Sequence, residues 1–307
     1  MEINIDINEE DIEDIKLGSN GKPLPPKNDL IALIDADTLL FGSCLHCEYE
    51  EELLPRSMYT DDEWEDIISN ETYYEGCESI GHINLEEAYA YTLEKLQTIL
   101  DNTGCQDYEL HFTVGRTSFR YTKVWDQYKA NRTEDPTKRA PAGLYDLKKM
   151  FAEKDKGFLH REWEADDIVV MKKKQWPDKY LLVALDKDVL YSLPGTHFNY
   201  YTSTQYNIPM KFFDVTEEEA MKHHYIQTLT GDSGDNVPGL HRVGKKTAEK
   251  ILKNCKTKEE CWEAVVKEYE KRGKDGIDAI LSMRLVHMQQ LEYNEELDKW
   301  EVKLWMP

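Results

Sequence analysis

Acidic residues fall in four short-spaced groups along the chain, and such groups can hold metal ions. The groups are Asp35/Asp37, Glu164/Asp166/Asp167, Asp186/Asp188 and Asp232/Asp235. Carboxylates grouped without histidine or cysteine favour hard ions that bind oxygen, such as Mg²⁺ or Mn²⁺. Two such ions about 4 Å apart can generate a hydroxide and stabilise the leaving oxygen of a phosphodiester. A single acidic pair is usually solvated or caps a helix, so the prediction depends on the four groups meeting in space.

The elements that must position these acids are short apolar runs, typical of strands that are buried on both faces. The runs cover residues 30–34, 109–114 and 180–185, and Asp35 and Asp186 directly follow two of them. Helical patterns at 85–100, 145–151 and 165–174 lie between the runs. Strands that alternate with helices predict an α/β fold with a parallel sheet, whose functional crevice lies outside the carboxyl ends of the strands.

Beyond residue 206, the sequence changes from strands alternating with helices to mostly helical patterns. Helical patterns at 217–231, 245–255 and 258–272 predict a helical second lobe. Residues 300–305 alternate like a strand and either extend a sheet edge or pair locally. Residues 44–83 form an acidic insertion, which we expect to contain surface loops and short helices.

A basic segment follows the last acidic group. Gly239 and Gly244 stand five residues apart, with Arg242 between them, and lead into Lys245 and Lys246. This spacing is typical of a helix–hairpin–helix, whose turn amides bind a DNA phosphate without reading the bases. The turn carbonyls of such a hairpin can also hold a monovalent cation, K⁺. A plain loop before a basic helix is the alternative interpretation.

Charge is unevenly distributed along the chain. The net charge is −22, yet residues 1–110 alone hold 28 acidic and 5 basic residues. Residues 116–161 hold 12 basic and 6 acidic residues, and residues 239–258 hold 7 basic and one acidic. Basic patches beside carboxylate clusters indicate a polyanionic substrate handled through metal ions. No apolar run approaches the ~20 residues that would span a bilayer, so we expect a cytoplasmic protein with no membrane partner, in the host cytoplasm if it is viral.

The order of these motifs resembles the FEN-like 5′-nucleases. The matching segments are Leu33-Ile34-Asp35-Ala36-Asp37, Tyr128-Lys129-Ala130-Asn131-Arg132, Glu164-Ala165-Asp166-Asp167, Asp186-Lys187-Asp188 and Gly231-Asp232-Ser233-Gly234-Asp235-Asn236-Val237-Pro238-Gly239. The resemblance covers residues 30–252. The form of the second segment and the C-terminal Leu304-Trp305-Met306-Pro307 are most similar to bacteriophage 5′→3′ DNA exonucleases.

The resemblance implies a parallel-sheet PIN/FEN-like nuclease core with a helical arch and a C-terminal helix–hairpin–helix lobe. We expect an acidic flexible tail at 1–28, the core with its arch at 29–206, and a helical DNA-binding lobe with a C-terminal strand at 207–307. The arch would lie within residues 120–149, the most basic stretch.

The resemblance also implies roles for individual residues. One metal ion would be held around Asp35, Glu164 and Asp166. The second ion or its water shell would use Asp167, Asp186, Asp188, Asp232 and Asp235. Lys129 and Arg132 would contact the scissile phosphate, and Tyr128 would stack on the terminal base. Further DNA contacts would come from Arg120, Gly239, Arg242, Gly244, Lys245 and Lys246. Independently of the resemblance, Lys129 and Arg132 are three residues apart and would share one cationic face of a helix.

One position departs from the family pattern. The family usually has an aspartate after the strand that here ends Thr113-Val114-Gly115-Arg116, and no acid stands there. Either Asp37 or an ordered water substitutes for it, or one ion binds more weakly.

The leading hypothesis is a two-metal 5′→3′ exonuclease that degrades duplex DNA from 5′ ends without sequence specificity. It would act in phage DNA replication, primer removal or host DNA breakdown, alongside other replication proteins. The alternatives are a 5′-flap endonuclease and a non-catalytic DNA-binding relative. A small-molecule phosphatase is a third alternative, but such an enzyme has no need of the basic hairpin.

Overall fold

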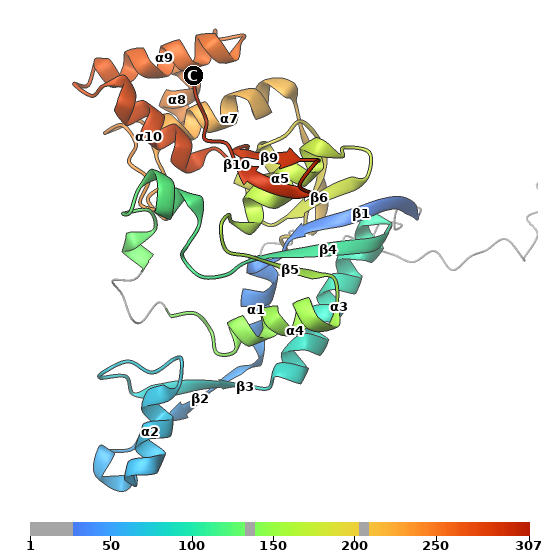
Figure 1. Cartoon of the computed structure of the whole chain (residues 1–307), viewed down its shortest axis with the longest axis vertical. Helices are drawn as coiled ribbons and strands as arrows, with labels where there is room; N and C mark the ends of the chain where they lie inside the picture. Colours follow the sequence, from blue (N-terminus) through green and yellow to red (C-terminus); the bar gives the residue numbers. More distant parts are fainter. Residues whose placement is uncertain (1–26, 133–138, 203–208) are drawn as a thin grey trace, which may run out of the picture.

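The computed structural model describes residues 27–132, 139–202 and 209–307, and its centre is a six-stranded sheet (Figure 1). Every neighbouring pair in the order β5-β4-β1-β6-β7-β8 is parallel except β7 with β8. The strands are β1 (Asn28–Asp35), β4 (Cys105–Thr113), β5 (Gly157–His160), β6 (Tyr180–Ala184), β7 (Gly195–Asn199) and β8 (Lys211–Val215). The predicted parallel sheet and its three predicted strands, β1, β4 and β6, are confirmed.

Helices cover both faces of this sheet, as Figure 1 shows. Ala32 and Ile34 of β1 point into one apolar cluster, and Leu33 between them points into the other. The first face carries α1 (Asp37–Cys47), α3 (Leu85–Thr103) and α4 (Leu144–Lys154), and the second carries α5 (Ala165–Gln175) and α6 (Lys187–Tyr191). The predicted helices α3, α4 and α5 are confirmed, and α1 was missed.

The predicted arch is only partly helical in the described residues. Residues 120–132 contain a π-helical turn η2 (Arg120–Val124) and a 3-10 turn η3 (Ala130–Arg132), and residues 133–138 lie outside the description. The upper part of the predicted range is wrong, because residues 144–149 belong to α4. Leu147 and Phe151 of that helix are fully buried against the sheet, so apolar packing fixes α4 in the core.

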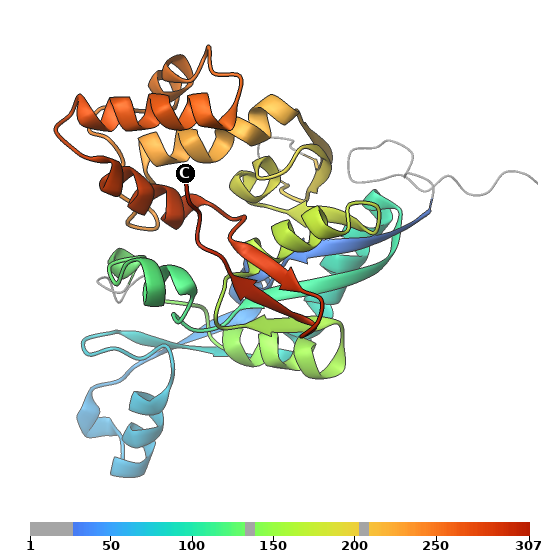
Figure 2. The same ribbon diagram turned by 45° about the horizontal axis from the view of Figure 1, so that its top comes forward.

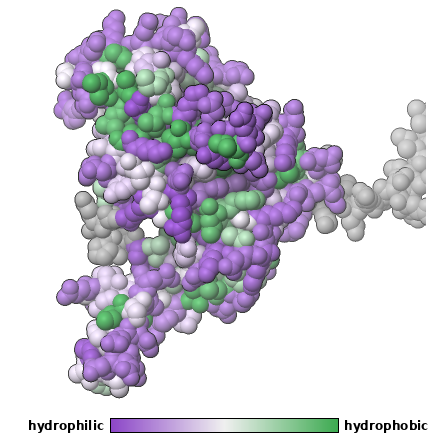
Figure 3. Space-filling view, viewed as in Figure 1, coloured by the Kyte–Doolittle hydropathy of each residue, from purple (hydrophilic) through white to green (hydrophobic). Residues whose placement is uncertain are grey.

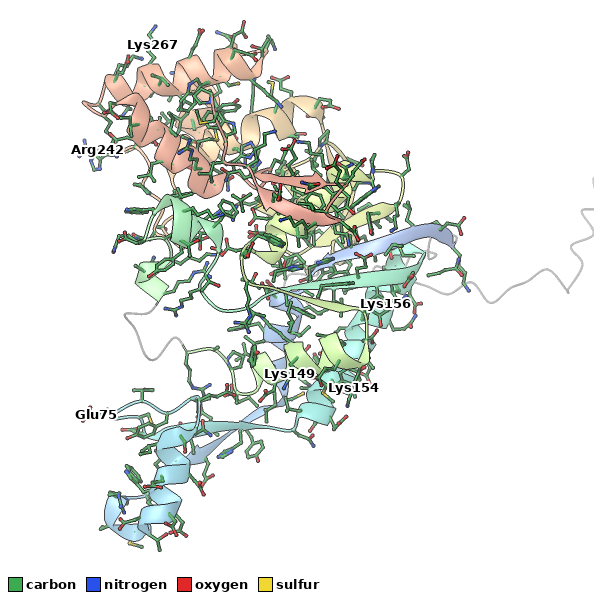
Figure 4. The ribbon with its side chains drawn as sticks, viewed as in Figure 1. Glu75, Lys149, Lys154, Lys156, Arg242 and Lys267 are labelled. Atoms are coloured by element: carbon green, nitrogen blue, oxygen red, sulfur yellow. The ribbon has the colours of Figure 1, made fainter. Side chains whose placement is uncertain are left out.

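The acidic insertion forms a module of its own beside the core. It contains β2 (Glu48–Glu52), η1 (Arg56–Met58), α2 (Asp61–Ser69) and β3 (Ser79–Ile83), and β2 pairs with β3 in an antiparallel ladder that the sequence did not predict. Figure 4 shows Glu75 at the outer tip of the loop that precedes β3. The face of the module seen in Figure 3 is mostly hydrophilic.

The C-terminal region is helical, as predicted. Helices α7 (Glu217–Thr230), α8 (Lys245–Ile251), α9 (Lys258–Glu270) and α10 (Gly276–Val286) surround one apolar cluster that includes Leu229 and Tyr269 (Figure 2). Helix α8 ends four residues earlier than predicted, and α10 was not predicted. Strand β10 (Lys299–Val302) pairs locally with β9 (Leu291–Asn294). No helix in the described ranges is long and apolar enough to cross a membrane. Residues 1–26 of the predicted tail lie outside the description.

Two glycines let the chain after α7 fold back closely on itself. Gly231 has a φ of 68°, and the hydrogen bonds Asp232 N–Val237 O (3.0 Å) and Val237 N–Asp232 O (2.7 Å) close the loop beyond it. A Cβ atom on Gly239 would lie 2.1 Å from the carbonyl oxygen of Thr230. This backbone contact holds the loop that carries Asp232, so Gly239 has a structural role.

We expect Gly239→Ala to lower the free energy of unfolding by about 2–3 kcal/mol, because rigid backbone must shift to admit the methyl group. Gly42→Ala is the matched control: Gly42 is an exposed position within α1 where a Cβ meets nothing within 4 Å. That change should instead stabilise the chain by about 0.5–1 kcal/mol. Urea unfolding of both variants tests the contrast, and equal effects would contradict it.

Candidate functional site

The carboxyl edge of the sheet gathers the predicted acids. Asp35 is the last residue of β1, and Asp186 caps the N-terminus of α6 by accepting a hydrogen bond from Asp188 N (2.8 Å). Glu164 is the N-cap of α5. One small cavity is lined by five of the acids, Asp166, Asp186, Asp188, Asp232 and Asp235. Parallel strands end at the same edge, so residues distant in sequence share one cleft.

Burial and mutual repulsion change the proton affinity of these acids. Burial, together with the charges of Asp37 and Asp186, raises the pKa of Asp35 to about 7. Burial, together with Asp186 and Asp232, raises the pKa of Asp188 to about 6. Burial also raises the pKa of Asp166, which lies beside Asp167 and Glu164. The cleft therefore holds more negative charge than the nearby side chains neutralise, and divalent ions bound by oxygen alone fit it.

Arg120 has a different role from the one expected, because it pairs with Asp167 inside the protein. Arg120 is 1% exposed and donates to both oxygens of Asp167, at 2.5 and 2.6 Å. Its Nε also donates to the carbonyl oxygen of Leu285 (2.8 Å). The expectation that Arg120 contacts DNA is wrong for this structure, because the guanidinium is enclosed. Asp167 also belongs, with Glu164 and Asp166, to a group of three acids whose ligand atoms lie within 4.8 Å of one another and could hold a metal ion.

Glu164 is surrounded by donors. Its Oε2 lies 3.2 Å from Arg120 Nη1 and accepts a hydrogen bond from the hydroxyl of Tyr128 (2.9 Å), and its Oε1 accepts from Lys129 Nζ. Burial alone would raise the pKa of Glu164, but Lys129 and Arg120 hold it below its usual value. The carboxylate is therefore charged and ready to bind a cation.

Tyr128, Lys129 and Arg132 converge on the same acids. The Tyr128 hydroxyl also lies 3.0 Å from Asp235 Oδ2, and the residue is 6% exposed. Tyr128 thus packs inside the protein, and its ring is not free to stack on a base as expected. Lys129 has a φ of 58°, and both Lys129 and Arg132 form ion pairs with Asp235. The two cations therefore share one acidic partner, and they reach it from a tight turn and not from the α-helix on which they were expected to share a face.

Asp37 lies at the end of β4, the strand that lacks the expected acid. Both of its oxygens lie 3.1 Å from the backbone N of Thr113, and Lys148 Nζ donates to it at 2.6 Å. The Asp37 carboxylate therefore accepts a hydrogen bond from the backbone N–H of Thr113 just beyond the last paired residues of β1 and β4. Lys148, almost fully buried, balances its charge, and no pattern in the sequence pointed to this residue.

The predicted hairpin places its basic residues on the surface. Arg242, Gly244, Lys245 and Lys246 are exposed, and Figure 4 shows Arg242 extending from the edge of the helical lobe. Gly239 is instead half-buried against the backbone of Thr230. Gln227, which the sequence analysis did not single out, lines the acidic cavity beside Asp188. A glutamine at this point of the sequence does not by itself indicate that the side chain lies beside the carboxylates.

The sequence is similar to DNA polymerases I and to separate 5′-3′ exonucleases. DNA polymerase I of Caldicellulosiruptor bescii is 26% identical over 202 residues, which are 59% of this chain and 23% of that protein. The 5′-3′ exonucleases of Buchnera aphidicola and Aquifex aeolicus are 29% and 30% identical, over 52% and 47% of this chain and 58% and 52% of their own lengths. No family model matches the sequence.

The fold is similar to that of the bacteriophage T5 5′-exonuclease. The crystal structure of the T5 protein with metal ions superposes with a TM-score of 0.54 at 14% identity and covers 84% of this chain and 89% of that one. The T5 flap endonuclease in a complex with DNA and metal ions gives a TM-score of 0.50 at 15% identity, over 65% and 80%. In sequence and in fold, the chain is thus similar to 5′-nucleases. It spans 23% or less of the DNA polymerases and about half of the separate exonucleases.

We expect Arg120→Met to lower the free energy of unfolding by about 3–5 kcal/mol, because Asp167 keeps a buried charge without its partner. Replacing both residues, as Arg120→Met with Asp167→Leu, should cost less than the single change. The control is Arg56→Met, which breaks an exposed ion pair with Asp61 and should change stability little. Denaturant unfolding measures all three. An Arg120→Met variant as stable as the control would show that the buried pair contributes little.

Proposed function

We propose that this chain is a divalent-metal-dependent 5′→3′ deoxyribonuclease that hydrolyses phosphodiester bonds of DNA. The observation that carries the proposal is the crowding of carboxylates at the edge of the sheet, where the pKa of Asp35 rises to about 7 and that of Asp188 to about 6. The similarity to 5′-3′ exonucleases supports the same conclusion.

Two ions of Mg²⁺ or Mn²⁺, when bound, would supply a hydroxide and stabilise the leaving oxygen. Asp35, Glu164 and Asp166 would hold one. Asp186, Asp188, Asp232 and Asp235 would hold the other or its water shell. The donor set fits, because it contains only oxygen. Asp167, whose ligand atom lies within 4.8 Å of those of Glu164 and Asp166, would serve the second ion or its water shell, while Arg120 balances part of its charge.

Lys129 and Arg132 would orient the phosphate at the cleft. Both already lie against Asp235, which lines the cavity. Their ammonium and guanidinium groups can turn to a phosphate oxygen and place positive charge where negative charge develops.

DNA would lie across the cleft and the helical lobe. Arg242, Lys245 and Lys246 are exposed there, at the loop and helix that we propose form the helix–hairpin–helix, with K⁺ at its turn. The proposed substrate is duplex DNA with a 5′ end or a 5′ flap, in cooperation with other replication proteins. The proposed division is a core at 29–206 and a DNA-binding lobe at 207–307.

Flap cleavage is a second candidate activity, because the T5 relative in the DNA complex is a flap endonuclease. A duplex and a 5′-flap substrate, labelled at the 5′ end, distinguish the two activities by product length. Mononucleotides and short products indicate an exonuclease, and one longer product indicates flap cleavage. If no Mg²⁺-dependent product forms, the remaining hypothesis is a DNA-binding protein without catalytic activity.

Asp188→Ala should reduce cleavage by at least about a thousandfold and leave DNA binding measurable, because it removes a carboxylate from the metal cleft and leaves the exposed cations of the lobe. Asp178→Ala is the matched control: Asp178 is exposed just before β6, whereas Asp188 follows the other end of that strand, in α6. Single-turnover cleavage and a binding titration in Ca²⁺ measure both properties. Wild-type turnover in Asp188→Ala would refute the metal mechanism.

Metal affinity should rise with pH between about pH 5 and 8. A proton on Asp35 or Asp188 must leave before an ion binds, and their raised pKa values of about 7 and about 6 place that competition in this range. Calorimetric titration with Mn²⁺ should show affinity falling by up to about tenfold for each pH unit below these values. In Asp35→Asn the dependence should become shallower. An affinity independent of pH would argue against ligation by these carboxylates.

A further inference from the structure

Gln227 stands in the wall between the acidic cleft and a second, larger cavity. The second cavity has a volume of about 670 Å³ and is lined by residues of α6, α7 and α8. Asp188, Gln227 and Asp232 line both cavities. The orientation of the Asp188 carboxylate therefore decides into which cavity its oxygens point.

The two sides of this wall act on Asp188 in opposite ways. On the cleft side, the charges of Asp186 and Asp232 repel it and raise its pKa. On the other side, the larger cavity is lined by four lysines and by Glu218, Glu219 and Glu249, and the charge of Lys245 favours the ionised carboxylate. Asp188 is thus repelled by its neighbours in the cleft and attracted by Lys245 outside it. A neutral donor at the wall opposes movement toward Lys245 without adding charge.

Gln227 is such a donor, and its orientation follows from its two partners. Its side chain hydrogen-bonds to Asp188, and its Oε1 lies 3.3 Å from His224 Nδ1. An amide oxygen only accepts, so His224 must donate from Nδ1, and the amide nitrogen must face the carboxylate. His224 thereby fixes which end of Gln227 meets Asp188.

His224 is well suited to hold the amide. It is 3% exposed, and its ring centroid lies 4.4 Å from that of His287. Burial keeps its pKa well below the usual value, so the ring is neutral and carries one proton. Its Nε2 is buried and has no hydrogen-bond partner among the described residues. The bond to Gln227 is therefore the one that selects the tautomer.

We propose that Gln227, held in orientation by His224, is a positioning residue that keeps Asp188 turned toward the divalent ion. This inference rests on the proposed function and adds a residue pair to it. Gln227 does not touch the ion; it acts through Asp188, as outer-shell hydrogen bonds orient metal-binding carboxylates in other proteins.

The test measures Mn²⁺ binding by calorimetry in the absence of DNA and then the Mg²⁺ dependence of cleavage. Gln227→Leu removes both amide contacts, and Gln227→Glu keeps the acceptor for His224 but loses the donor. Both should weaken binding of one of the two ions by about 10–100-fold and raise the Mg²⁺ concentration needed for cleavage. Excess Mg²⁺ should restore most of the maximal rate. Gln97→Leu, at an exposed site on α3, is the control and should match the wild type.

A double-mutant cycle separates positioning from simple packing. His224→Leu should weaken Mn²⁺ binding in the wild-type background and have no further effect in the Gln227→Leu background. Melting temperatures identify any variant that fails to fold. If Gln227→Leu does not fold, the Mn²⁺ affinity of Gln227→Glu, which preserves the shape of the side chain, tests the proposal. Folded Gln227 variants with both Mn²⁺ affinities within twofold of wild type would overturn the positioning role alone. A wild-type chain that binds no Mn²⁺ would overturn the proposed function as well.

Discussion

Crowding of negative charge at one edge of the sheet is the constraint that shapes the surrounding structure. Strands β1 and β6 end at this edge, and helices α5 and α6 begin there, so their terminal acids share one space. Burial removes the water that would separate these charges, and the pKa values of Asp35 and Asp166 rise. Such an arrangement is stable only where bound protons, cations of the protein or bound metal ions offset the negative charge.

Three of the cations that contact these acids come from one segment, residues 120–132, and Lys148 of α4 balances Asp37. Arg120 neutralises Asp167, and Lys129 and Arg132 contact Asp235. The same segment joins the sheet to the helical lobe, because Arg120 Nε donates to Leu285 O and Lys129 N donates to Asp235 O at 3.0 Å. The placement of the lobe and the electrostatics of the cleft therefore depend on the same contacts.

Charge of opposite sign is separated along the molecule. Residues 1–110 hold 28 acidic and 5 basic residues, and much of this acidity lies on the β2–β3 module, which extends away from the helical lobe (Figures 1 and 4). Arg242, Lys245 and Lys246 are exposed on that lobe. Charges farther apart than the Debye length of about 10 Å are largely screened. A strongly acidic chain can therefore still offer a polyanion a basic surface.

The sequence was sufficient for features that depend on local pattern. Short apolar runs predicted β1, β4 and β6, and their ends placed Asp35 and Asp186 at one edge, because the side-chain periodicity of buried strands is visible in the residues themselves. Helix α1 was missed because Ala36 provides no side-chain cap and the strand runs almost directly into the helix. Strands β5, β7 and β8 are short, and pairing across the sheet, more than their own pattern, determines them.

Only the tertiary structure decided which polar residues face the cleft. Asp166 and Asp167 are adjacent at the start of α5, yet Asp166 lines the cavity and Asp167 is paired with Arg120 from a distant segment. Tyr128, in a basic motif, is buried against the acids, and Gln227 stands beside Asp188. Motifs showed that carboxylates would meet. Which carboxylates remain free for an ion depends on long-range contacts, because the partners that neutralise them are brought together by folding and not by their spacing in the chain.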